Sequence, residues 1–303
     1  MPELPEVETI VRDLRKKIIG RKIESVWFDS PRQIFLQKKM ADSKLARAPQ
    51  IDIFERRIKG LKIIDVQRRA KNILIYLSDD QMLLIHQKMT GHLLYGKWNI
   101  AGKKLSSSLK GAMQEKVNDY IHFILSFDNG WQLALSDLRK FAKVIFASRE
   151  NIENLKEIKE LGPEPLEKNF DFKNFEKIIG NKSGKIKQVL MDPYVISGIG
   201  NIYSDDILWE AKIHPFRPAK SLNKKELKST FLAIKKILTQ AVKLRGTSIS
   251  DYRDVEGKKG YYVDKRRVYR REGEKCLRCK SEIKRVKMGG RSAHFCPKCQ
   301  KLS

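Results

Sequence analysis

Residues 276–299 read CLRCKSEIKRVKMGGRSAHFCPKC, and their cysteine spacing predicts how the C-terminal part of the chain folds. Cys276 and Cys279 form one Cys-x2-Cys pair, and Cys296 and Cys299 form a second pair after 16 intervening residues. Each pair can hold one edge of a tetrahedral ion, so the spacing predicts one zinc site. Four thiolates leave no position for a reactive water, which makes the zinc structural. Two disulfides are the alternative.

The distribution of cysteines favours the metal. None occurs in the first 275 residues, whereas a secreted disulfide scaffold would distribute them along the chain. A local metal site in a reducing cytoplasm fits this pattern better. Between the two pairs, residues 284–291 are basic and contain the turn Gly289-Gly290. A hairpin of this kind can enter a groove of nucleic acid and contact phosphates.

Upstream of the cysteines the pattern is helical. One apolar stripe at helical spacing consists of Leu227, Phe231, Ile234, Leu238 and Ala241. Before it, the glycine-rich turn 197–201 opens a helix predicted from Ile202 to about Ala211. Free N–H groups at such a helix start can bind an anion, and a plain helix-start turn is an equally good interpretation.

The first half of the chain is rich in β-type runs. Short apolar runs predict strands at Ile73–Leu77, Met82–His86, Tyr120–Phe127, Trp131–Leu135 and Val144–Phe146. Asp128-Asn129-Gly130 predicts a hairpin turn. A helix is expected from Pro5 onwards, with residues 2–4 as an extended arm. Leu161-Gly162-Pro163-Glu164-Pro165 is typical of a domain boundary.

Composition indicates a polyanionic partner. The 303 residues include 63 Lys and Arg against 36 Asp and Glu, a net charge of +27. The segment from residue 251 to the end holds 17 basic and 7 acidic residues, or +10 of this excess. Nucleic acid is the leading candidate, with an anionic membrane surface or solubility as alternatives. No membrane-spanning run or signal peptide is evident.

The N-terminus contains a candidate nucleophile. Removal of Met1 would leave Pro2 with a free secondary amine. An α-amino group titrates near 8, far below lysine, so more of it is neutral and able to form a Schiff base. The nearby carboxylates of Glu3 and Glu6 could transfer protons. The alternative is that Pro2 and Pro5 only shape the helix entry.

Several motifs together resemble one family. They are residues 1–9 (MPELPEVET), 67–71 (QRRAK), 161–165 (LGPEP), 198–203 (GIGNIY) and 289–291 (GGR) ahead of 295–299 (FCPKC). In this order they resemble bacterial formamidopyrimidine-DNA glycosylase, a repair enzyme for oxidised purines. The likeness extends over essentially the whole chain.

The resemblance implies an α+β multidomain fold. An N-terminal β-sandwich catalytic domain with flanking helices would span residues 1–150. A helix-two-turn-helix DNA-binding domain would span 151–265, and a zinc-finger β-hairpin 266–303. Double-stranded DNA containing oxidised purines or abasic sites would bind between the domains. A monomer in the cytoplasm is expected, without membrane attachment.

The resemblance also assigns roles to matching residues. Pro2 would be the nucleophile, Glu3 its acid–base partner and Glu6 a supporting carboxylate. Lys71 matches the lysine of β-elimination and Arg291 the arginine of δ-elimination. The phosphate-binding positions are Lys182, Lys187 and Asn201.

A base must leave the duplex before it can react, and the enzyme must fill the hole. Met89, Arg139 and Phe141 match the void-filling residues of the family. Without the resemblance, Met89 and Phe141 would be assigned to the core and Arg139 to the solvated surface. Residues 246–262, with Thr247, Ser248 and Ser250, resemble a loop that closes over the flipped base. A plain surface loop is the alternative.

Three positions depart from the family pattern. Gln87-Lys88 replaces a small apolar pair, Leu138 replaces a proline, and Asn118 replaces a DNA-contacting histidine. The resulting prediction is a bifunctional DNA glycosylase and abasic-site lyase for 8-oxoguanine and formamidopyrimidines. The alternatives are an endonuclease VIII-like enzyme for oxidised pyrimidines and a non-enzymatic, zinc-dependent DNA-binding protein.

Overall fold

The computed structural model describes residues 1–37, 45–47, 51–101, 104–107, 110–249 and 251–302. Its contacts divide the chain into two compact units. Unit 1 contains Met1–Lys159 and Arg245–Tyr261, and unit 2 contains Glu160–Leu244 and Tyr262–Ser303. The segment 245–261, which lies inside the expected second domain, therefore makes its contacts with unit 1. Among the described helices, none has the length and apolar character needed to cross a membrane.

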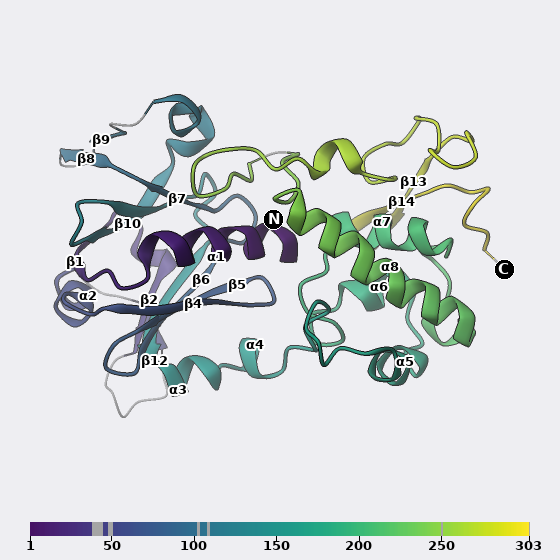
Figure 1. Ribbon diagram of the computed structural model, residues 1–303, viewed down its shortest axis with the longest axis horizontal. Helices are drawn as coiled ribbons and strands as arrows, with labels where there is room; N and C mark the ends of the chain where they lie inside the picture. Colours follow the sequence, from purple (N-terminus) through teal and green to yellow (C-terminus); the bar gives the residue numbers. More distant parts are fainter. Residues whose placement is uncertain (38–44, 48–50, 102–103, 108–109, 250, 303) are drawn as a thin grey trace. The chain divides into compact units, whose positions relative to one another are not determined.

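Unit 1 is built on two β-sheets (Figure 1). The four-stranded sheet has the order β1 (Ile23–Phe28), β10 (Ile121–Phe127), β11 (Gln132–Ser136) and β7 (His92–Gly96). The six-stranded sheet has the order β3 (Leu45–Arg47), β2 (Ile34–Gln37), β12 (Lys143–Ser148), β6 (Gln81–His86), β5 (Asn72–Leu77) and β4 (Ile63–Arg69). Neighbouring strands are antiparallel except for β12 and β2, which are parallel.

Helices flank the sheets of unit 1. They are α1 (Leu4–Ile18), α2 (Ile51–Ile58), α3 (Arg149–Glu153) and α4 (Lys156–Lys159). The apolar face of α1, including Val7, Ile10 and Leu14, joins residues of both sheets in one buried cluster. Phe54 of α2 lies in the same cluster and packs against Phe123. The unit is therefore the expected β-sandwich with flanking helices.

Most predicted elements of unit 1 are confirmed with small shifts at their ends. The five predicted strands correspond to β5, β6, β10, β11 and β12. Gly130 forms the expected hairpin turn with φ of +72°, a conformation that glycine adopts without steric cost. The helix predicted from Pro5 is α1, and its predicted start was wrong by one residue. Leu4 already belongs to α1, so the extended arm ends at Glu3. The strand predicted from Tyr120 begins at Ile121.

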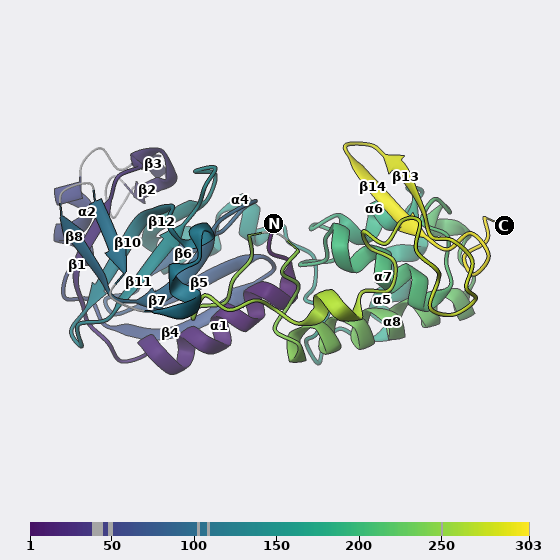
Figure 2. The same ribbon diagram turned by 90° about the horizontal axis from the view of Figure 1, so that it is seen from above.

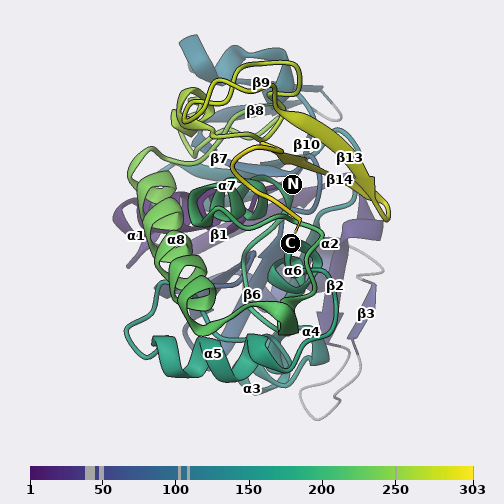
Figure 3. The same cartoon turned by 90° about the vertical axis from the view of Figure 1, so that its right-hand side faces the viewer.

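Unit 2 is helical and ends in a hairpin (Figures 2 and 3). Its elements are α5 (Phe172–Gly180), α6 (Ile186–Met191), α7 (Asn201–Ala211), α8 (Lys224–Lys243), β13 (Lys284–Met288) and β14 (Arg291–Phe295). The predicted apolar stripe forms the buried face of α8, and the predicted helix from about Ile202 is α7. Asn223 and Glu226 form a capping box that begins α8. The basic segment between the cysteine pairs is the hairpin β13–β14, as expected.

Candidate functional site

The start of α1 brings two carboxylates together. Glu3 is the N-cap of the helix, and its side chain accepts a hydrogen bond from the backbone of Glu6. Glu6 Oε2 in turn accepts a hydrogen bond of 2.8 Å from Glu3 N. A reciprocal capping box forms between the N-cap side chain and a Glu or Gln three residues later, which is the spacing of Glu3 and Glu6. Glu3, Glu6 and the adjacent Pro2 are all buried.

The second oxygen of Glu6 is held from a distant part of the chain. Glu6 Oε1 accepts a hydrogen bond of 2.7 Å from Thr247 N. Gly246 makes this approach possible, since a Cβ there would lie 2.7 Å from Glu6 Oε1. Its φ of +79° also favours glycine. The segment after α8 therefore belongs to the surroundings of the N-terminal carboxylates.

Electrostatics at the chain start favour a neutral amine. Burial lowers the pKa of the α-amino group of Met1, while the charges of Glu3 and Glu6 oppose this shift. The positive charge of Lys71 lowers the pKa further, which places this lysine in the same electrostatic environment. Lys71 follows Ala70 in the turn between β4 and β5. Pro2, Glu3 and Glu6 lie together at the start of α1, and Lys71 lies in the turn between β4 and β5.

The three void-filling candidates lie on two exposed loops rather than in the core. The side chains of Met89 and Phe141 are 46 % and 51 % exposed, and Arg139 is also exposed. Met89 lies between β6 and β7, whereas Arg139 and Phe141 lie between β11 and β12. The guanidinium of Arg139 lies 4.5 Å from the ring centroid of Phe141. Exposed apolar groups on loops can enter a partner.

Asp137, which belongs to none of the sequence motifs, joins these two loops. It is fully buried, and its Oδ1 accepts hydrogen bonds from Thr90 Oγ1 and Arg139 N. Its Oδ2 accepts a hydrogen bond of 2.7 Å from Ala142 N. One carboxylate thereby orders both the loop of Met89 and the loop of Arg139. An acidic residue directly after a strand was the only available signal in the sequence.

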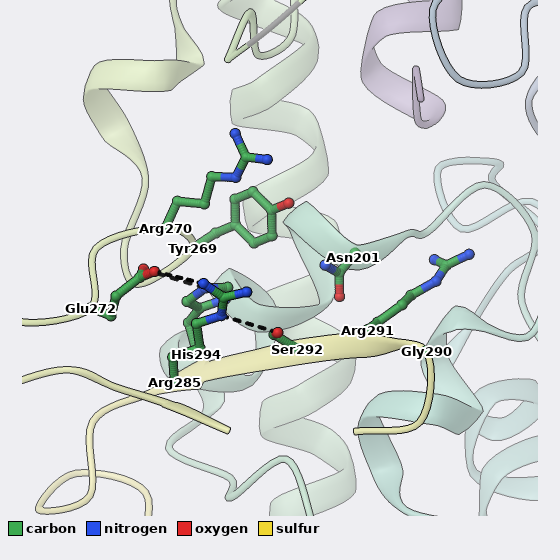
Figure 4. Close-up of a pocket in the computed structure, with 9 residues that line it drawn as sticks. All are labelled: Asn201, Tyr269, Arg270, Glu272, Arg285, Gly290, Arg291, Ser292 and His294. Atoms are coloured by element: carbon green, nitrogen blue, oxygen red, sulfur yellow. Dashed lines mark hydrogen bonds and ion pairs between the residues drawn. The ribbon is translucent and has the colours of Figure 1, made fainter. Parts of the chain in front are cut away.

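Two of the DNA-contacting candidates meet in unit 2. Asn201 is the first residue of α7, and Arg291 is the first residue of β14. Both line a hollow of about 710 Å³ (Figure 4). The other residues around it are Tyr269, Arg270, Glu272, Arg285, Gly290, Ser292 and His294. Three arginines, one acid and a helix N-terminus suit an anion such as phosphate.

Lys187 has a different environment from the one its predicted role suggests. Its ammonium group is buried and donates to Asp205 Oδ1 at 2.6 Å and to the carbonyl of Ser292 at 2.8 Å. Asp205 Oδ2 also accepts from the backbone N–H of His294 at 3.0 Å. This arrangement fixes the hairpin that carries Arg291. Lys182 is exposed and is not among the residues that line the hollow.

The four cysteines form a cage of the size that zinc requires. Their Sγ atoms lie within 4.8 Å of one another, and none forms a disulfide. A tetrahedral ion with Zn–S distances of about 2.3 Å separates its sulfurs by about 3.8 Å. The indole N–H of Trp209 donates to Cys276 Sγ at 3.3 Å. The geometry fits one structural zinc ion, as predicted, and the disulfide alternative was wrong.

Asn118 and the described residues of the predicted closing loop make hydrogen bonds within unit 1. Asn118 is buried, and its Oδ1 lies 2.8 Å from His92 Nε2. Thr247 contacts Glu6, and Ser248 Oγ donates to the carbonyl of Tyr252 at 2.7 Å. Ser250 lies outside the described residues.

Family models match the three parts of the chain. Residues 1–144 match the formamidopyrimidine-DNA glycosylase N-terminal domain, and residues 161–253 match the H2TH domain of the same enzyme. Residues 273–302 match the zinc finger found in FPG and IleRS.

Whole-length relatives agree with these matches. The formamidopyrimidine-DNA glycosylase of Desulforamulus reducens is 38% identical over 99% of both chains. The corresponding protein of Pelotomaculum thermopropionicum is 37% identical over 100% of both chains. A solved complex of Lactococcus lactis Fpg with abasic-site DNA has a TM-score of 0.83 at 32% identity, covering 99% of each chain.

Proposed function

This chain belongs to the formamidopyrimidine-DNA glycosylase family, and we propose that it is a bifunctional glycosylase and abasic-site lyase acting on oxidised purines in duplex DNA. The observation that carries the proposal is the environment of Pro2. Two buried carboxylates, Glu3 and Glu6, lie beside it, and Glu6 is held at both oxygens.

The first step needs the free secondary amine of Pro2, and therefore loss of Met1. The Pro2 nitrogen attacks C1′ of the damaged nucleoside, and the bond from C1′ to the base breaks; the base leaves with the electron pair of that bond and takes up a proton from water. Glu3 acts as the acid–base partner: it takes the proton from the Pro2 nitrogen and supplies the proton for the ring-opening of the sugar. The product is an iminium that joins Pro2 to C1′, with release of the base.

The iminium makes the protons at C2′ acidic. Removal of one of them expels the 3′ phosphate, with Lys71 as the proposed partner in proton transfer. A second elimination expels the 5′ phosphate, for which Arg291 is the proposed residue. Hydrolysis of the iminium then regenerates the Pro2 amine. These reaction steps need no oxidant or reductant, because each of them is an addition, an elimination or a hydrolysis.

DNA contacts are assigned by chemistry. We propose that Asn201 and Arg291 bind a phosphate in their shared hollow, with Lys182 as a peripheral cation. Met89, Arg139 and Phe141 are proposed to enter the duplex when the damaged base is flipped out. Lys187 is proposed to act by holding the hairpin of Arg291, because its ammonium group is already bound to Asp205 and Ser292.

Oxidised pyrimidines are the second candidate substrate class. A solved complex of the Lactococcus lactis enzyme contains DNA with an oxidised pyrimidine, and another contains Fapy-dG. Comparing excision from 8-oxoguanine and thymine-glycol duplexes decides between the classes. The relatives named above are bacterial, so we place the proposed activity at the chromosome in the cytoplasm. One copy carries all the proposed residues, which fits a monomer.

Borohydride trapping tests the proposed chemistry. Protein without Met1 should become covalently linked to 8-oxoguanine DNA, and mass spectrometry should locate the link at Pro2. Pro2→Gly should reduce the adduct sharply. Protein that retains Met1 is the matched control: its Pro2 nitrogen is an amide, so the protein should bind DNA and mass spectrometry should find no link at Pro2. A processed protein that binds lesion DNA but gives no adduct would favour the non-enzymatic zinc-dependent alternative.

A further inference from the structure

An excursion of the chain between β7 and β10 covers the second face of the four-stranded sheet. Its described part contains the strands β8 (Trp98–Ala101) and β9 (Lys104–Ser107) and two 3-10 helices (Gly111–Gln114 and Lys116–Asn118). Side chains alternate between the two faces of a strand. One face of the four-stranded sheet belongs to the main core, and the other face is left for the excursion to cover. On this face Trp98 and Met113 of the excursion pack with Leu94, Ile124 and Ala134 of the sheet.

The same excursion binds the segment that follows α8. Arg253 donates from Nε and Nη2 to Glu115 Oε2, at 2.9 and 2.7 Å. The Arg253 side chain is only 7 % exposed, and its Nη1 donates to the carbonyl of Tyr252. Gly257 lies against Ala112, because a Cβ at this glycine would be 2.8 Å from the Ala112 carbonyl oxygen.

The other side of this segment contacts the candidate active site. The buried Tyr252 hydroxyl donates to the carbonyl of Glu6 at 3.4 Å, and Thr247 N donates to Glu6 Oε1 at 2.7 Å. Ser248, the neighbour of Thr247, donates from its Oγ to the Tyr252 carbonyl and so links Thr247 to Tyr252. The sequence of contacts runs from Glu115 to Arg253, from Arg253 to the Tyr252 carbonyl and from the Tyr252 hydroxyl to the Glu6 carbonyl.

We propose that Glu115 and Arg253 are a positioning pair that sets the placement of Thr247, Ser248 and Tyr252 beside the reacting nucleotide. The inference rests on the proposed glycosylase function. A buried guanidinium without its carboxylate would draw in water and loosen the backbone that it holds. A small displacement of groups beside a substrate lowers a rate strongly. Glu6 would keep its hydrogen bond from Glu3 N, so chemistry at the sugar would continue.

This pair therefore affects base excision and strand nicking differently. An intact lesion presents a base that the polar segment can hold, whereas an abasic site has no base. Glu115→Gln removes the charge and keeps the shape. Its excision of 8-oxoguanine under single-turnover conditions should fall by at least about fivefold, while nicking of the same duplex with a preformed abasic site stays within about twofold.

Hydrogen exchange provides a second readout that does not depend on activity. Backbone amides of residues 251–257 should exchange faster in Glu115→Gln than in the unaltered protein, without DNA. Glu115→Gln combined with Arg253→Gln should be no slower in excision than the more impaired single variant, because the two residues act as one pair. The matched control is Glu153→Gln, which removes an exposed ion pair with Arg149 of 2.8 Å. It should change none of these quantities.

Three results would overturn the positioning pair: unchanged excision in Glu115→Gln, an equal fall in excision and nicking, or unchanged exchange at residues 251–257. An unaltered protein that neither excises nor nicks would instead refute the proposed function and, with it, the rate effect. The exchange measurement still reports in that case whether Glu115 holds the segment.

Discussion

Glu6 Oε1 accepts a hydrogen bond from Thr247 N, although the two residues lie 241 positions apart in the chain. The bond makes the segment after α8 part of the N-terminal site, and it depends on the absence of a side chain at Gly246. Gly246→Ala would place a Cβ within 2.7 Å of the Glu6 carboxylate. We expect lesion excision by this variant to fall at least about tenfold, because the carboxylate must move.

Gly60 offers a control that separates the effect of the steric clash at Gly246 from the effect of backbone strain. Gly60 has φ of +83° and no atom within 4 Å of an added Cβ. Gly60→Ala should therefore cost about 1–2 kcal/mol of unfolding free energy through its backbone alone, with excision retained. Thermal unfolding and excision assays on both variants check this. Equal excision by Gly246→Ala and Gly60→Ala would contradict the role of the Glu6 contact.

Lys187 should contribute to stability through its buried ion pair. Lys187→Met leaves the carboxylate of Asp205 without its cation, and we expect the free energy of unfolding to fall by about 3–5 kcal/mol. Denaturant unfolding measures this change. Lys236→Met is the control, because that exposed pair with Glu210 should contribute about 0–1 kcal/mol. Similar losses of unfolding free energy in both variants would show that the buried ion pair of Lys187 contributes no more to stability than the exposed pair of Lys236.

The zinc site should depend on every sulfur. Cys296→Ser is expected to lower the zinc content below one ion per chain and to weaken DNA binding, because the hairpin of Arg291 loses its anchor. Native mass spectrometry and a binding titration measure the two effects. Ser281→Ala keeps all four sulfurs and should retain the ion. Full zinc content in Cys296→Ser would exclude this residue as a ligand.

Arg291 should contribute one phosphate contact. In a plot of log affinity against log salt concentration, Arg291→Ala should reduce the magnitude of the slope by about 1. Arg149→Ala serves as the control, since this guanidinium is paired with Glu153. Titrations of both variants at several salt concentrations test the assignment. An unchanged slope in Arg291→Ala would remove this residue from the DNA contacts.

His86 should make unit 1 sensitive to acid. Burial, followed by the charges of Lys88, Lys71 and Lys143, lowers the pKa of this imidazole to about 3. The unfolded chain binds the proton near pH 6.5, so stability is present above that pH and is lost as the pH falls towards 3.

His86→Asn tests this dependence, because an amide oxygen can replace the ring nitrogen that accepts from Lys88 N. Between pH 7.5 and pH 5 the unaltered protein should lose about 2 kcal/mol more unfolding free energy than His86→Asn. Denaturant unfolding at the two pH values provides the comparison. Equal losses would mean that another group causes the acid sensitivity.

Sequence periodicity and spacing determined the local parts of this protein. The Cys-x2-Cys pairs predicted the zinc cage, and the apolar stripe predicted the buried face of α8. Glu3 and Glu6 are three residues apart, the spacing of a capping box at the start of a helix. These features depend on contacts between near neighbours, and such contacts follow from the geometry of a helix, a turn or a metal ion.

Only the tertiary structure decided which distant residues meet. Thr247 reaches Glu6, Asp137 joins the loops of Met89 and Arg139, and Lys187 is enclosed by Asp205 and Ser292. Apart from Asp137 and Arg139, which are two residues apart, the partners lie at least 18 positions from each other in the chain. Each contact forms because packing of sheets and helices leaves a buried polar group that must find a partner, and the identity of that partner depends on the whole fold.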